Sequence, residues 1–147
     1  EEGYKLTMHC DVNQVDIVDH IWQCLDDIEV DRIDHGINSL EDEKLCQEIS
    51  SRGLGLTVCP VSNRFVVQSL TSQEIKAMLA RRMKVSIHSD DPGYFRAYLT
   101  DNYLALIEEA EFSRAEIMQL NRHAFETSWL EDEQKQGYLE RLQQYWS

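Results

Sequence analysis

Four short segments of the chain each end in side chains that can bind a metal ion or move a proton. Each segment carries apolar or β-branched residues and is bounded by polar or Gly/Pro punctuation, which is typical of a β-strand. Histidine and carboxylate groups bind catalytic zinc and are also frequent general acids and bases. A polar turn after a strand would explain a single Asp-Asp-Pro. Reactive side chains at the ends of four strands favour a shared site instead. The segments and the residues that follow them are 4–8 with His9, 30–34 with His35, 54–58 with Ser62 and Asn63, and 84–88 with Asp90 and Asp91.

Helical patterns follow these segments. Residues 14–28 carry an apolar stripe from Val15 to Ile28 with the spacing i, i+3, i+4, i+7, which is expected to face the sheet. Pairs with the spacing of a capping box precede other helices: Thr71 with Glu74, Ser113 with Glu116, and either Asn38 with Glu41 or Ser39 with Asp42. The predicted helices are 14–28, 40–52, 71–82, 100–110, 113–129 and 131–145.

This alternation of strand and helix predicts four βα units whose strands lie parallel and adjacent in chain order. The carboxyl ends of parallel strands share one edge of the sheet, where α/β folds carry their chemistry. We therefore expect His9, His35, Asn63 and Asp90 at the same edge.

The fold class is α/β, in one unit of residues 1–147. Four strands could form a small doubly wound domain or half of an eight-stranded barrel of about 250 residues. Because the sequence starts almost directly on a strand, we interpret it as strands five to eight, the second half, of a (β/α)8 barrel of the TIM type plus C-terminal helices. The other half would be another chain or a segment outside this sequence, and it would bury the open edges. The inner face is expected to be apolar, built from Leu6, Ile33, Leu56 and Val85.

Composition excludes several classes of protein. The 14 basic and 27 acidic residues give a net charge of −13, which disfavours a basic face for nucleic acid. No apolar run approaches the roughly 20 residues of a membrane span, and no secretory leader is visible, so we expect a cytoplasmic protein. The four cysteines form no Cys-x-x-Cys pair, which excludes a zinc ribbon and a thioredoxin motif and favours buried thiols.

At four points the sequence resembles the adenosine and adenine deaminases. The motifs, in the order in which that family has them, are His9 at a strand end, Arg32-Ile33-Asp34-His35-Gly36, Cys59-Pro60-Val61-Ser62-Asn63 and Ser89-Asp90-Asp91-Pro92. The resemblance runs from about Leu6 to the helix end at 121–130. It implies a zinc-dependent barrel of the amidohydrolase type that removes the 6-amino group of a purine and releases ammonia.

The resemblance also implies a role for individual residues. His9 and Asp90 resemble two of the zinc ligands, His35 the histidine beside the metal-bound water, and Asp91 the carboxylate that orients the purine. The family's other two ligands form a His-x-His pair on the first strand, which is absent here, so this chain alone should not form a competent metal site. We expect Ser62 and Asn63 to shape the supporting loop and assign them no chemistry.

The sequence departs from the family where the proton donor is expected. The family continues its strand-five histidine as His-Ala-Gly-Glu, whereas this chain reads His9-Cys10-Asp11-Val12. Val12 cannot transfer a proton, and Asp11, one residue earlier, is the candidate to replace the missing glutamate. His88 and His123 stand where asparagine is common. His88 could point into the pocket, although a packed or solvent-facing side chain is the expectation.

Three interpretations of function follow. The first is a purine or related aminohydrolase that takes a small-molecule purine-type substrate. The second is a non-catalytic barrel remnant, a pseudoenzyme or a subunit that completes a barrel with another chain. A stand-alone flavodoxin-like domain is disfavoured, because no Gly-rich phosphate loop follows any strand.

Overall fold

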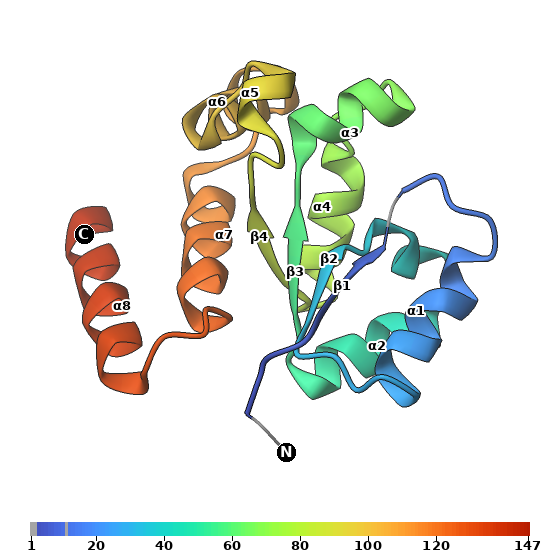
Figure 1. Ribbon diagram of the computed structural model, residues 1–147. Coiled ribbons are helices and arrows are strands. Elements are labelled where there is room, and N and C mark those ends of the chain that lie inside the picture. The colour runs from blue at the N-terminus through green and yellow to red at the C-terminus, as the bar shows by residue number, and fades with distance from the viewer. Residues whose placement is uncertain (1–2, 11) are drawn as a thin grey trace.

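The computed structural model describes residues 3–10 and 12–147, and in them four parallel strands form one sheet (Figure 1). The strands are β1 (Thr7–Cys10), β2 (Arg32–His35), β3 (Gly55–Val58) and β4 (Lys84–Ile87), and each pairs with the next in chain order. The predicted order, direction and adjacency of the strands are confirmed.

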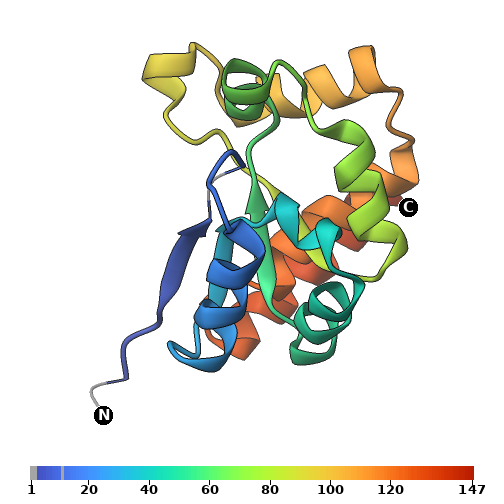
Figure 2. The same cartoon turned by 90° about the vertical axis from the view of Figure 1, so that its right-hand side faces the viewer.

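Helices follow every strand, with bounds that differ from the predictions by a few residues. They are α1 (Ile17–Asp26), the 3-10 helix η1 (Ile37–Glu41), α2 (Glu43–Arg52), α3 (Pro60–Val67), α4 (Ser72–Ala80), α5 (Pro92–Phe95), α6 (Leu99–Ala110), α7 (Arg114–Glu126) and α8 (Asp132–Trp146). Figure 2 shows α1, α2 and α4 gathered on one side of the sheet. Helix α7 packs on β4, and α8 lies outside α7 (Figure 1).

Of the capping boxes predicted from the sequence, the structure confirms one and contradicts another. Ser113 and Glu116 form the predicted capping box of α7. The box predicted at Thr71 is wrong, because Thr71 has a left-handed backbone (φ 52°) and its hydroxyl donates to the carbonyl of Leu70. Helix α2 starts with Asp42, whose carboxylate accepts the N–H of Lys44.

The apolar stripe predicted over 14–28 is shorter than expected. Helix α1 begins only at Ile17, because Asp16 has a left-handed backbone (φ 55°). Val15 is 80% exposed and Ile28 is 41% exposed, so neither belongs to the buried face of the helix. The buried residues of α1 are Ile17, Ile21, Cys24 and Leu25.

The apolar residues lie on the face of the sheet opposite to the one predicted. Ile33, Leu56 and Val85 are aligned in one row of the sheet and are fully buried in the core that it forms with the helices. Leu6 precedes β1 and is 45% exposed. Because side chains alternate between the faces of a strand, the opposite face takes Arg32, Asp34 and Thr57 and is polar. The expectation of an apolar inner face is therefore wrong.

Candidate active site

Three of the predicted site residues line one pocket at the carboxyl ends of the strands. His9 is the last residue but one of β1, His35 ends β2, and Asp90 follows β4. The rings of His9 and His35 meet edge to face with centroids 4.6 Å apart, and Nε2 of His35 lies 3.8 Å from Oδ2 of Asp90. The pocket has a volume of about 320 Å³, and its lining is His9, Arg32, Asp34, His35, Thr57, Cys59, His88, Ser89 and Asp90.

A left-handed backbone turns His35 into this pocket. On a regular strand Asp34 and His35 would face opposite sides, yet both line the pocket, and His35 has φ 62°. Gly36 follows with φ 71° and donates its N–H to the carbonyl of Cys10. Asp90 is also left-handed, with φ 57°. Non-glycine residues with positive φ are uncommon, and such strained positions cluster at functional sites.

Gly36 is needed both for its conformation and for its lack of a side chain. A Cβ at this position would lie 2.7 Å from Cδ2 of Leu56 and 2.9 Å from Cγ2 of Ile33, in the middle of the core. Gly36→Ala is therefore expected to lower the free energy of unfolding by about 1–3 kcal/mol, measured by urea denaturation. Gly93→Ala is the control, because a Cβ there meets no atom within 4 Å. Equal stability of the two variants would contradict this account.

Polar groups on the inner face form the floor of the pocket. Thr57 donates its hydroxyl to Asp34 at 2.7 Å, and Nε of Arg32 lies 3.6 Å from the same carboxylate. The guanidinium of Arg32 stacks over Trp129, 3.9 Å from the ring centroid. A charged network thus lies directly below the histidines.

His88 belongs to the pocket, contrary to the expectation of a packed or solvent-facing side chain. Its Nε2 is hydrogen-bonded to the hydroxyl of Ser86 at 2.9 Å, two residues earlier along the chain. Burial, and to a lesser extent the charge of Arg32, lower the pKa of His88, while Asp34 acts in the opposite direction. The two-residue period of a strand was the signal that could have placed His88 beside Ser86 on the inner face.

His123 is structural and does not line the pocket. It is 8% exposed, and its Nδ1 accepts the backbone N–H of Val85 at 3.1 Å. Burial is the main cause that lowers its pKa below the usual 6.5; Lys84 and Arg122 act in the same direction, and Glu126 opposes them.

This burial predicts a dependence of stability on pH. The unfolded chain binds a proton at His123 near pH 6.5, whereas the folded chain resists it, so stability should fall as the pH drops below about 6.5 and stop falling below the folded pKa. Urea denaturation at pH 7.5 and 5.5 should show a smaller loss for His123→Asn than for the wild type. An equal loss in both proteins would show that His123 is not responsible.

The first turn of α3 contacts Asp90. Ser62 donates its hydroxyl to Oδ2 of Asp90 at 2.6 Å. The thiol of Cys59 donates to the carbonyl of Thr57 at 3.7 Å. Burial, followed by the charges of Asp90 and Asp34, raises the pKa of this thiol to about 12. Cys59 is therefore a neutral thiol at physiological pH. Asn63, predicted at the same edge, does not line the pocket and donates to Oγ1 of Thr71 instead.

The other candidates lie apart from this cluster. Asp91 is exposed and is not among the lining residues; its carbonyl accepts the N–H groups of Tyr94 and Phe95 in α5. Val12 is partly buried and packs against the hydrophobic core. Asp11, the predicted substitute for the proton donor, lies outside the described residues.

The donor atoms suit zinc, which binds imidazole nitrogen, thiolate and carboxylate oxygen. His35, Cys59 and Asp90 offer ligand atoms within 4.8 Å of one another, and His9 stands against His35. His9 is exposed on β1, at the open edge of the sheet. Its imidazole contacts His35 of β2 and lines the pocket.

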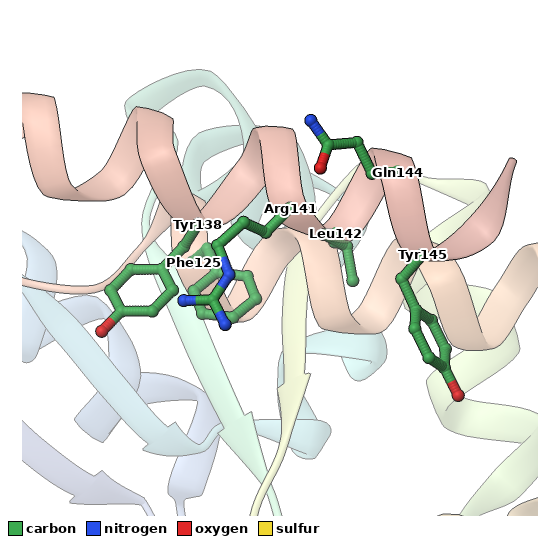
Figure 3. Close-up of a pocket in the computed structure, with 6 residues that line it drawn as sticks. All are labelled: Phe125, Tyr138, Arg141, Leu142, Gln144 and Tyr145. Carbon is green, nitrogen blue, oxygen red and sulfur yellow. The ribbon is translucent and has the colours of Figure 1, made fainter.

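A second, larger hollow lies between α7 and α8 (Figure 3). It has a volume of about 630 Å³, and the rings of Phe125 and Tyr138 are stacked in it 5.2 Å apart, with Arg141 beside them. Its lining brings together no histidine, cysteine or carboxylate. Among the described pockets, the chemistry predicted from the sequence is concentrated at the strand ends.

Comparisons with known proteins identify the family of the chain. The model of the adenosine deaminase family matches residues 1–145. An uncharacterised deaminase of Schizosaccharomyces pombe is 42% identical over 97% of this chain and 42% of its own length. The adenine deaminase of Marinomonas sp. is 42% identical over 95% of this chain and 42% of its own length.

Solved structures confirm the architecture. The crystal structure of adenine deaminase from Arthrobacter aurescens is 32% identical and superposes with a TM-score of 0.90 over 97% of this chain and 44% of that chain. An amidohydrolase from Burkholderia ambifaria with bound Zn shares the fold, with a TM-score of 0.84 at 18% identity. The four βα units are thus part of a (β/α)8 barrel, and the chain spans less than half the length of the relatives it matches. By sequence and by fold, the chain belongs to the adenosine deaminase family.

Proposed function

We propose that this chain forms the catalytic second half of a zinc-dependent aminohydrolase that removes ammonia from an aminopurine such as adenine or adenosine. The observation that carries the proposal is the convergence of His9, His35 and Asp90 in one pocket at the carboxyl ends of neighbouring strands. The relatives named adenine deaminase support the class of substrate.

His9 and Asp90 would hold the metal ion. A bound zinc would supply a Lewis acid and lower the pKa of its water to about 7. Two protein ligands are fewer than the three of known catalytic zinc sites, so further ligands must come from the rest of the barrel. The exposed imidazole of His9 at the open edge is suitably placed to meet them.

His35 would take or hold the proton of the attacking water. Its Nε2 lies 3.8 Å from Asp90, so the imidazole stands beside the metal-binding carboxylate, and it is 5% exposed. A positioned imidazole of this kind is a suitable general base near neutral pH. Asp91 is not among the residues that line the pocket in this half of the barrel. From the resemblance to the family, we assign to it a hydrogen bond with the purine ring that orients the ring.

The donor of the proton to the ring nitrogen is the point at which this chain differs from the family. Val12 packs against the core and is not among the lining residues, so it does not act in the pocket. Asp11 is the carboxylate that lies nearest to His9 in the sequence, and we assign the donor role to it. A shorter donor at an altered position would favour a substrate ring with a different arrangement of nitrogen atoms.

The missing half of the barrel is the partner that we propose. Among the described residues, β1 pairs with β2 on one side and with no strand on its other side. Thr7, Met8 and His9 of β1 are exposed. A half-barrel that covers the polar inner face around Arg32 and Asp34 would have to offer complementary polar groups. No helix among the described residues is long and apolar enough to cross a membrane. With a net charge of −13, binding of nucleic acid is not proposed, and the cytoplasmic location stays a prediction.

The test is release of ammonia from a panel of aminopurines and aminopyrimidines by the complete protein with zinc bound. Release from at least one 6-aminopurine, with Asp91→Ala raising KM, would support the proposal. If the zinc-bound protein releases no ammonia from any member of the panel, the pseudoenzyme interpretation replaces it.

A further inference from the structure

We propose that Ser62 is a positioning residue that fixes the carboxylate of Asp90 for the metal ion. This inference rests on the proposed function, in which Asp90 is a ligand. In this arrangement the hydroxyl of Ser62 occupies Oδ2 and leaves Oδ1 for the ion.

The contact between the two residues is short and shielded. Oγ of Ser62 lies 2.6 Å from Oδ2 of Asp90, within the range of strong hydrogen bonds between a hydroxyl and a carboxylate. Ser62 is 3% exposed, so water does not compete well for its hydroxyl, whereas the side chain of Asp90 is 27% exposed and open to the pocket. Oδ2, the oxygen of Asp90 that Ser62 contacts, is therefore on the shielded side of the carboxylate.

Asp90 needs such support because of its backbone. It lies beyond the end of β4 with φ 57°, a conformation that costs free energy unless neighbouring groups stabilise it. The hydroxyl of Ser62 supplies such a contact by donating to the carboxylate of Asp90. This contact comes from the first turn of α3, which lies beside the end of β4 (Figure 1).

Ser62 is itself held firmly. The preceding residue, Val61, donates its N–H to Oδ1 of Asn102, a buried residue of α6, at 3.0 Å. The following residue, Asn63, is 1% exposed and is tied through its side chain to Thr71. Anchors on both sides restrict the rotation of α3, so the hydroxyl of Ser62 reaches Asp90 from a fixed direction.

The experiment measures the zinc dissociation constant of the complete protein by competition with a chromogenic chelator. Groups that orient metal ligands typically change metal affinity 10- to 100-fold when removed, so Ser62→Ala should weaken zinc binding by about this factor. Ser62→Thr keeps the hydroxyl and should bind zinc within a few-fold of the wild type. Ser39→Ala is the matched control, because Ser39 is fully buried and its hydroxyl has no hydrogen-bond partner among the described residues.

Asp90→Ala separates the failure of this inference from the failure of the proposed function. If Asp90→Ala loses zinc while a folded Ser62→Ala binds it as tightly as the wild type, the positioning role of Ser62 is refuted and the metal site stands. If Asp90→Ala keeps the wild-type affinity, both are refuted. Should Ser62→Ala fail to fold, Ser62→Cys gives the decision: affinity between those of the wild type and Asp90→Ala supports the role, and wild-type affinity overturns it.

Discussion

Replacing His35 with asparagine should lower kcat by about 10²- to 10⁴-fold, the usual cost of losing a positioned general acid or base. The imidazole lies beside Asp90 and against His9, so its loss removes the group that would receive the proton of the attacking water. The bound zinc should remain, because His9 and Asp90 are unchanged. Steady-state ammonia release and metal analysis of the same preparation measure both effects.

His20→Asn is the control for this variant. His20 is exposed on α1 and does not line the pocket of His35, so its replacement should leave kcat within about twofold. Full activity in a folded His35→Asn protein would remove His35 from the mechanism.

Asp11→Asn should also lower kcat by about 10²- to 10⁴-fold if Asp11 protonates the ring nitrogen. The companion variant is Val12→Glu, which restores the family's glutamate in sequence. Because Val12 packs against the hydrophobic core, this glutamate would bring a charge to an apolar contact, so it should destabilise the protein and leave the rate unimproved. A Val12→Glu protein with increased kcat, together with unchanged activity of Asp11→Asn, would place the donor at position 12 instead.

The arrangement of the strands followed from the sequence because it depends on local patterns and on one general rule. Four βα units in succession leave little choice about strand direction or neighbours, and this brought His9, His35 and Asp90 to one edge. The capping box of Ser113 was equally local and was found correctly.

The errors arose where hydrogen bonds and packing contacts in the folded chain override the spacing signals of the sequence. The hydroxyl of Thr71 binds the carbonyl of Leu70 and the side chain of Asn63, which the spacing to Glu74 cannot indicate. Arg32, on the inner face that was expected to be apolar, stacks on Trp129 from almost 100 residues away, a contact that the pattern of residue types does not indicate.

The supporting residues of the site were the least predictable part. The sequence motif includes Ser62, but its contact with Asp90 depends on how α3 is anchored to α6. The left-handed turn at His35 also depends on the room that Gly36 leaves beside Ile33 and Leu56. A pattern of residue types gives no information on the distance between Ser62 and Asp90 or on the space beside Gly36.

The most direct test of the proposed zinc-dependent aminohydrolase activity is the zinc content of the complete protein. It is compared with the zinc content of Asp90→Ala and His9→Ala, and ammonia release is then measured in the same samples. The proposed site predicts one zinc per chain in the wild type and loss of both zinc and ammonia release in each variant, because His9 on β1 and Asp90 after β4 would each supply a ligand in the same pocket. Retention of zinc and of activity by Asp90→Ala would contradict the account.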